Sequence, residues 1–88
     1  MSQLLDVRTA DEWAEGHVRG ALHIDVQEIM NGQLPDTPKD TELLVYCRSG
    51  GRAGMAAAVL KRAGFTNVQN IGGLEEALQY GELEAGKN

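Results

Sequence analysis

The sequence predicts a single α/β domain in which a small parallel β-sheet of about four strands is flanked by helices on both faces. Short apolar segments alternate with segments of helical spacing along the 88 residues, an order typical of parallel strands joined by right-handed crossovers. Residues 43–46 are apolar at consecutive positions, as in a strand covered on both faces. A chain of this length builds one core and shows no repeat or linker, so one domain over 1–88 is expected.

The N-terminal part is predicted to contain two strands and one helix. An apolar strand over Leu4–Val7 leads into a brief helix near Asp11–Glu15. The side-chain oxygen that caps this helix is expected to come from Thr9 or, less favourably, from Asp11. Glycines flank His17–Arg19, which predicts a tight bend. The next apolar segment, Ala21–Ile24, is expected to form the second strand.

The middle of the chain is predicted to place a glycine-bearing loop between a buried strand and a helix. Val26–Asn31 has the composition of a short helix, whereas 32–40 contains both prolines and indicates a surface loop. Glu42–Tyr46 contains the most apolar strand segment. The residues that follow it, Cys47–Gly51, form a loop that opens into the next helix.

The C-terminal part is predicted to add a helix, a strand and a closing helix. Apolar side chains at helical spacing indicate a largely buried helix over about 52–63: Ala53, Met55, Ala56, Ala57, Val59 and Leu60. Gly64 is the candidate C-cap. Val68–Ile71 is expected to be a strand, a glycine pair the turn after it, and Leu74–Tyr80 the closing helix. The polar tail, 81–88, is expected to fray.

Composition excludes several classes of function. The net charge of −5 repels phosphate backbones, so no nucleic-acid partner is expected. No apolar stretch is long enough for a membrane-spanning helix, and the N-terminus lacks the features of a secretion signal. The first strand begins almost at the first residue, as it would after removal of a leader or in a sequence that starts at a domain edge. Nothing in the pattern argues for assembly, so a monomer is expected.

The single cysteine stands in a setting that favours a thiolate. Cys47 follows a buried strand and precedes a helix, and reactive groups of α/β sheets gather at the carboxyl ends of strands. Two adjacent glycines allow backbone N–H groups to turn inward as a cup, and the helix N-terminus adds further donors. Arg48 and Arg52 add two positive charges. Such surroundings lower the pKa of a thiol, so Cys47 is the candidate nucleophile, and we expect its side chain to be open to solvent.

Four segments, taken in order, resemble the motifs of single-domain rhodaneses. They are Leu5-Asp6-Val7-Arg8 with Glu12-Trp13, Gly16-His17-Val18-Arg19-Gly20-Ala21, the loop Cys47-Arg48-Ser49-Gly50-Gly51-Arg52, and Gly72-Gly73-Leu74. The match extends from about Leu4 to Leu78, and the short termini are most similar to the small periplasmic rhodaneses of the phage-shock type. Arg19 and Asp25 stand where the family usually has proline, and the N-terminal strand and helix of longer members have no counterpart in this sequence.

The resemblance implies a bacterial thiosulfate sulfurtransferase that works by double displacement. It assigns the nucleophile to Cys47, which would carry sulfur as a persulfide, and implies no cofactor. It assigns substrate and persulfide binding to the loop that follows: Arg48, Ser49, Gly50, Gly51, Arg52 and Ala53. Arg52 would help to hold the anion, and Arg48 would meet the substrate charge. Thiosulfate is the implied donor, and cyanide, a thiol or a thioredoxin-like protein the acceptor. The resemblance favours a periplasmic location over a cytoplasmic one.

Two other functions stay open. A phosphatase or arsenate reductase also uses a loop from a cysteine to an arginine, but its pattern has five intervening residues, whereas four separate Cys47 from Arg52. The shorter loop makes a cup better sized for a sulfur atom than for a tetrahedral phosphate. A non-catalytic rhodanese-like carrier or binding module is the other alternative, although such modules commonly lack the cysteine.

The remaining polar residues are interpreted mainly as structural. Asp6 and Arg8 lie at the reactive edge and are supporting candidates, for which an ion-pair role is favoured over catalysis. Arg8 is expected to pair with Glu12. His17 and His23 are predicted to serve the bend and packing, and the sequence offers no metal-ligand pattern, so no metal is expected. Two aromatic residues, Trp13 and Tyr46, are expected in the core, and the acidic residues from 75 to 84 on a solvated face.

Overall fold

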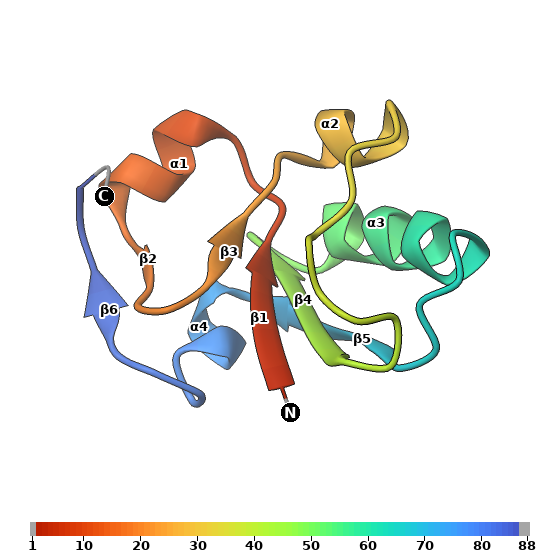
Figure 1. Cartoon of the computed structure of the whole chain (residues 1–88). Coiled ribbons are helices and arrows are strands. Elements are labelled where there is room, and N and C mark those ends of the chain that lie inside the picture. Colours follow the sequence, from red (N-terminus) through yellow and green to blue (C-terminus); the bar gives the residue numbers. More distant parts are fainter. Residues whose placement is uncertain (1, 87–88) are drawn as a thin grey trace.

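A computed structural model describes residues 2–86 of the protein (Figure 1). The elements along the chain are β1 (Ser2–Asp6), α1 (Ala10–Glu15), β2 (His17–Val18), β3 (Leu22–His23), α2 (Val26–Met30), β4 (Glu42–Cys47), α3 (Gly51–Arg62), β5 (Val68–Gly73), α4 (Leu74–Ala77) and β6 (Leu83–Glu84). The alternation of strands and helices confirms the predicted α/β class.

The main sheet has four parallel strands in the order β3-β1-β4-β5. Its two central strands are the most buried: Leu5 of β1 pairs with Val45 of β4, and neither side chain is exposed to solvent. In β4, every residue from Leu43 to Cys47 is buried. This explains the run of consecutive apolar residues and confirms the prediction of a strand covered on both faces.

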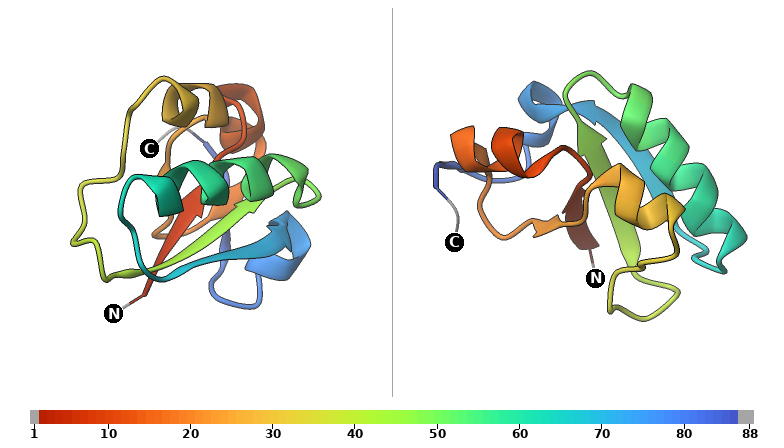
Figure 2. Two further views of the ribbon diagram at one scale, coloured as in Figure 1. Left: turned by 90° about the vertical axis from the view of Figure 1, so that its right-hand side faces the viewer. Right: turned by 90° about the horizontal axis from the view of Figure 1, so that it is seen from above.

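Helices cover both faces of the sheet, and each face has its own core. The larger core lies under α2 and α3 and includes Leu5, Val45, Cys47, Ala53 and Leu60. The smaller core lies under α4 and contains Val18, Tyr46 and Ala77, with Leu74 packed against it. In Figure 2, α3 and α4 lie on opposite sides of the strands. Successive residues of β4 therefore alternate between the two cores.

Helix termini follow the predicted local signals. Thr9 is the N-cap of α1: its hydroxyl accepts a hydrogen bond from the N–H of Glu12, and the Glu12 carboxylate accepts one from the N–H of Thr9. This is a capping box. Gly64, just past the end of α3, has a φ of +108°, the left-handed conformation for which glycine is favoured at this position.

Four local predictions are wrong because distant parts of the chain determine the structure. The predicted bend His17–Arg19 contains strand β2, and the predicted frayed tail contains its partner β6. The two strands pair antiparallel across more than sixty residues, which a local pattern does not reveal. The closing helix ends at Ala77 instead of residue 80, since the chain must turn back toward β2. The predicted turn Gly72-Gly73 belongs to β5, which has a register shift before these residues.

Residues 87 and 88 of the predicted tail lie outside the described residues. Over residues 2–86, the helices are too short and too polar for any of them to traverse a lipid bilayer.

Candidate active site

Cys47 is the last residue of β4, whereas the sequence predicted it as the first residue of the loop. It pairs with Gly73, the last residue of β5, and the neighbouring strand β1 ends at Asp6. Because these strands are parallel, their carboxyl ends meet at one edge of the sheet, the end toward which the β1 and β4 arrowheads point in Figure 1. The structure therefore brings Cys47, the β1–α1 connection and the predicted glycine pair to the same edge, as expected.

Backbone N–H groups form the predicted cup around the Cys47 sulfur. The N–H of Gly50 donates a hydrogen bond to Sγ over 2.9 Å. Burial of the thiol would raise the pKa of Cys47, but hydrogen bonding from the N–H groups of Ala53, Ser49, Gly50 and Arg52 outweighs it, and the net pKa lies below that of an ordinary thiol. The loop thus favours the thiolate, the nucleophilic form of cysteine.

The two loop glycines have different roles. Gly50 has a φ of +104°, a conformation that other residues adopt only with strain, and this conformation turns the loop into α3. Gly51 has no such requirement and begins the helix. The expectation that both glycines adopt special dihedral angles is therefore correct for Gly50 alone.

The expectation that Cys47 is open to solvent is wrong. Only 1% of Cys47 is exposed, because β4 is a central strand and the first turn of α3 packs over its end. Ala53 of that turn is also completely buried. The sulfur lies beneath the loop, although the neighbouring N–H groups still face it.

The arginines of the loop differ in what they contact. Arg48 is exposed, and its side chain makes no hydrogen bond or ion pair with another residue between 2 and 86. Arg52 instead forms a bidentate pair with Glu12, with Nη1 2.7 Å from Oε1 and Nη2 3.0 Å from Oε2. The hydrogen bonds from Arg52, together with those from Thr9, outweigh burial and lower the pKa of Glu12 to about 2. The guanidinium predicted to hold the substrate anion is thus already bound to a carboxylate, from a residue 40 positions away in the sequence.

Asp6 and Arg8 form a buried ion pair next to the site. Arg8 Nε lies 3.1 Å from both carboxylate oxygens of Asp6, and Nη2 lies 2.8 Å from Oδ2. Nη2 also donates to the carbonyl oxygen of Gly16. The expected pairing of Arg8 with Glu12 is wrong, because Asp6 on the same strand end is the closer carboxylate. The pair ties β1 to the chain after α1, which agrees with the structural interpretation.

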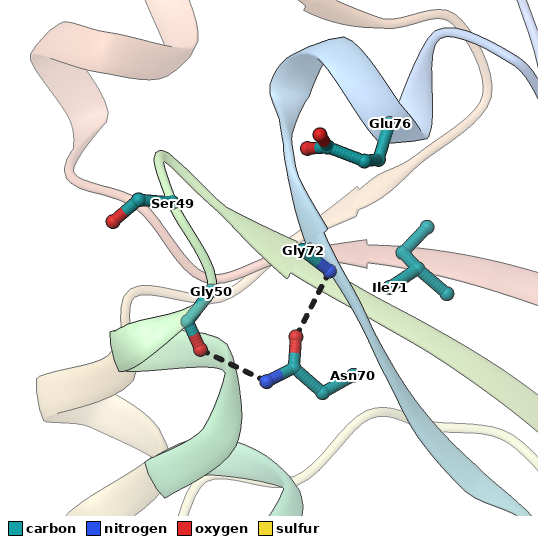
Figure 3. A pocket seen from close by; sticks show the side chains of 6 residues that line it. All are labelled: Ser49, Gly50, Asn70, Ile71, Gly72 and Glu76. Atoms are coloured by element: carbon teal, nitrogen blue, oxygen red, sulfur yellow. Dashed lines mark hydrogen bonds between the residues drawn. The ribbon is translucent and has the colours of Figure 1, made fainter.

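A groove of about 570 Å³ lies beside the loop (Figure 3). Its lining comes from the loop and from the end of β5: Ser49, Gly50, Asn70, Ile71, Gly72 and Glu76. Asn70 links the two sides, since its amide nitrogen donates to the carbonyl oxygen of Gly50 and its amide oxygen accepts from the N–H of Gly72. Sequence reasoning missed Asn70 and Glu76. An asparagine two residues before a glycine is, however, the signature of this kind of side-chain turn.

Gly73 packs directly against the backbone of the loop at Arg48, and Gly73→Ala is expected to destabilise the protein. A Cβ at this position would lie 2.1 Å from the carbonyl oxygen of Arg48, so the backbone of the loop would have to move. Overpacking of this kind costs about 2–3 kcal/mol. Chemical denaturation measures the loss. Gly51→Ala is the matched control for stability, because its Cβ would meet no atom within 4 Å, and equal stability of the two variants would contradict the prediction.

The histidines take packing positions, as predicted. The ring of Trp13 stacks on His17 at 3.4 Å and on His23 at 4.8 Å between ring centroids. Nδ1 of His17 is hydrogen-bonded to the carbonyl oxygen of Trp13, and Nε2 of His23 to that of Arg8. In the described part of the chain, no group of three or more His, Cys, Asp or Glu side chains is arranged to hold a metal ion.

Comparisons with known proteins agree with this architecture. The profile of the Rhodanese-like domain family matches residues 1–79. Thiosulfate sulfurtransferase PspE of Escherichia coli strain K12 is 34% identical over 73 residues, which are 82% of this chain and 70% of that protein. A sulfurtransferase of Allochromatium vinosum is 36% identical over 70 residues, 80% of this chain and 64% of that protein. A solved rhodanese with anions from Escherichia coli covers 98% of this chain and is itself wholly covered, with 30% identity and a TM-score of 0.81.

Proposed function

The chain belongs to the Rhodanese-like domain family, and from this premise we propose that it transfers a sulfane sulfur from thiosulfate through a persulfide on Cys47. Relatives named as sulfurtransferases support sulfur transfer in general. The observation that carries the specific proposal is the ring of backbone N–H groups directed at the Cys47 sulfur. A structural cysteine would not require it.

In the proposed reaction, the Cys47 thiolate attacks the outer sulfur of thiosulfate. A bond forms between Sγ and that sulfur, the bond to the sulfonate sulfur breaks, and sulfite leaves with the bonding electron pair. The acceptor, cyanide or a thiol, then attacks the outer sulfur of the persulfide and releases the Cys47 thiolate. Two half-reactions of this kind give ping-pong kinetics. No separate general base is required, because the lowered pKa of Cys47 supplies the thiolate.

In the proposed reaction, the backbone of the loop and its arginine side chains bind different groups. The N–H groups that stabilise the thiolate would also stabilise the negative charge of the persulfide. The exposed guanidinium of Arg48 is free to attract a dianion such as thiosulfate, whereas Arg52 is already paired. Because only 1% of Cys47 is exposed, small donors are favoured. The groove along Ser49 and Asn70 offers an acceptor space at the side of the loop.

The structure disfavours the phosphatase alternative for a geometric reason. Binding a phosphate in such a loop requires an arginine directed at the anion, but Glu12 holds both terminal nitrogens of Arg52. A pure binding module has no need of a thiolate, so the N–H groups directed at the Cys47 sulfur argue against that alternative. We also propose a monomer and, from the resemblance to the phage-shock type, a periplasmic location, which sedimentation and fractionation of the full-length product would test.

Treatment with thiosulfate is expected to add the mass of one sulfur atom to the protein. The sulfur should map to Cys47, and cyanide should remove it as thiocyanate. The rate of loading should be maintained from the ordinary thiol pKa of 9.0 down to the lowered pKa of Cys47, below which it should fall as the thiolate is protonated. Intact-mass spectrometry measures both. Absence of added sulfur would overturn the proposal, and hydrolysis of p-nitrophenyl phosphate without thiocyanate formation would favour the phosphatase alternative.

A further inference from the structure

We propose that Glu12 is a positioning residue for sulfur transfer, whose carboxylate holds the Arg52 guanidinium to one side of Cys47 and keeps the amide cup free for the incoming sulfur. This inference rests on the proposed function, since it assigns another residue to the same site. It concerns a contact between α1 and α3, the helices that follow the two central strands of the sheet.

The contact has the geometry of a strong ion pair. Both terminal nitrogens of Arg52 meet both oxygens of Glu12, over 2.7 Å and 3.0 Å, and such bidentate pairs fix the plane of the guanidinium. The side chains are only 32% and 22% exposed, so water screens the attraction less than at the surface. Arg52 cannot turn toward the sulfur without losing both bonds.

The carboxylate of Glu12 is itself held in place by the start of its helix. Oε1 accepts hydrogen bonds from the N–H of Thr9 over 3.0 Å and from its hydroxyl over 3.2 Å. The bond from the N–H belongs to the capping box of α1, the bond from the hydroxyl adds to it, and neither involves Arg52. Glu12 is therefore oriented by the β1–α1 connection, and it transmits that orientation to the first turn of α3.

An unpaired Arg52 would have an alternative anion close by. The backbone N–H of Arg52 faces the Cys47 sulfur. The pKa of Arg52 is raised mainly by its bonds to Glu12, against an opposing effect of burial, and the charge of the Cys47 thiolate raises it further. Asp25, the N-cap of α2, is the other anion that acts on Arg52, and its carboxylate accepts from the N–H of Gln27. On the other side of the ion pair, the positive charge of Arg8 interacts electrostatically with the Glu12 carboxylate. Without Glu12, the guanidinium is drawn toward the thiolate and covers the amides that should receive sulfur.

The variant Glu12→Gln separates this role from helix capping, because glutamine also completes a capping box. We expect the acid limb of the pH profile of Cys47 alkylation to move to lower pH by about half a unit. The substitution removes a negative charge near the thiolate and leaves the positive charge of Arg52 unpaired, and both changes favour the ionised thiol. At a pH where the thiol is fully ionised, kcat/KM for thiosulfate should nevertheless fall roughly tenfold, as expected for a misplaced group in the site. A more ionised thiol with slower transfer is a combination that a loss of folding does not produce.

Two further variants make the test decisive. Glu15→Gln removes an exposed carboxylate of the same helix, and Glu15 has no hydrogen bond or ion pair with another residue of the described part. It should leave both measurements unchanged. In an Arg52→Gln background, Glu12→Gln should have no additional effect on kcat/KM, because Glu12 acts through Arg52. Additive effects, or an unchanged pH profile in Glu12→Gln, would overturn the inference. If the unmodified protein takes up no sulfur, the proposed function fails, but the alkylation profile still decides the role of Glu12.

Discussion

Replacing Cys47 by serine should reduce thiosulfate-dependent sulfur transfer by at least roughly 10⁴-fold, to the uncatalysed background. Two effects combine. A serine hydroxyl is not ionised under conditions in which the amide cup favours a thiolate at Cys47, and an oxygen cannot form the persulfide that carries sulfur between the two half-reactions. Thiocyanate formation at saturating thiosulfate measures the loss. Transfer within tenfold of the unmodified rate would contradict a role for Cys47 as nucleophile.

The same variant should show that the cup stabilises the thiolate in the folded protein. Because the folded pKa of Cys47 lies below the ordinary value of 9.0, the ionised form contributes stability that is fully present above about pH 9 and is lost as the pH falls through the folded pKa. The difference in unfolding free energy between the unmodified protein and Cys47→Ser should therefore increase with pH over this range and then level. A difference independent of pH would mean that the amides do not favour the thiolate.

The chemistry of the loop could be predicted from the sequence because its determinants are adjacent. A cysteine after an apolar strand, two glycines and a helix start define an amide cup within seven residues. In the structure, the N–H of Gly50 donates to Sγ, and those of Ser49, Arg52 and Ala53 also act on it. Burial of the same cysteine could not be predicted in this way. It depends on how the first turn of α3 packs over β4, and the packing involves residues of both elements.

Partners of charged residues were predicted less well than elements, for the same reason. Arg52 and Glu12 are 40 residues apart, and β2 and β6 are further apart still. Sequence spacing favours local pairs, such as Arg8 with Glu12, whereas the fold offers Arg8 the carboxylate of Asp6 at the same strand end. Asn70 likewise acquires its role only when β5 brings it against the loop.

Removing the carboxylate of Asp6 should be the most destabilising change at the carboxyl edge of the sheet. In Asp6→Ala, the guanidinium of Arg8, only 5% exposed, loses three of its four hydrogen bonds and remains as a buried, largely uncompensated charge. Breaking a buried pair in this way costs about 3–5 kcal/mol, a large part of the roughly 5–15 kcal/mol that stabilises a domain. Thermal unfolding should shift downward by more than about 10 °C.

The surface pair of Arg19 with Glu82 gives the matched control, since these side chains are 64% and 81% exposed. Glu82→Ala should cost less than about 1 kcal/mol, because water replaces the lost partner. Adding Arg8→Met to Asp6→Ala should recover part of the stability, since the unpaired charge is then removed as well. If Asp6 and Arg8 are purely structural, the folded fraction of Asp6→Ala should still load sulfur on Cys47. A loss below about 1 kcal/mol in Asp6→Ala, similar to that in Glu82→Ala, would contradict the assignment of this pair as the buried support of the site.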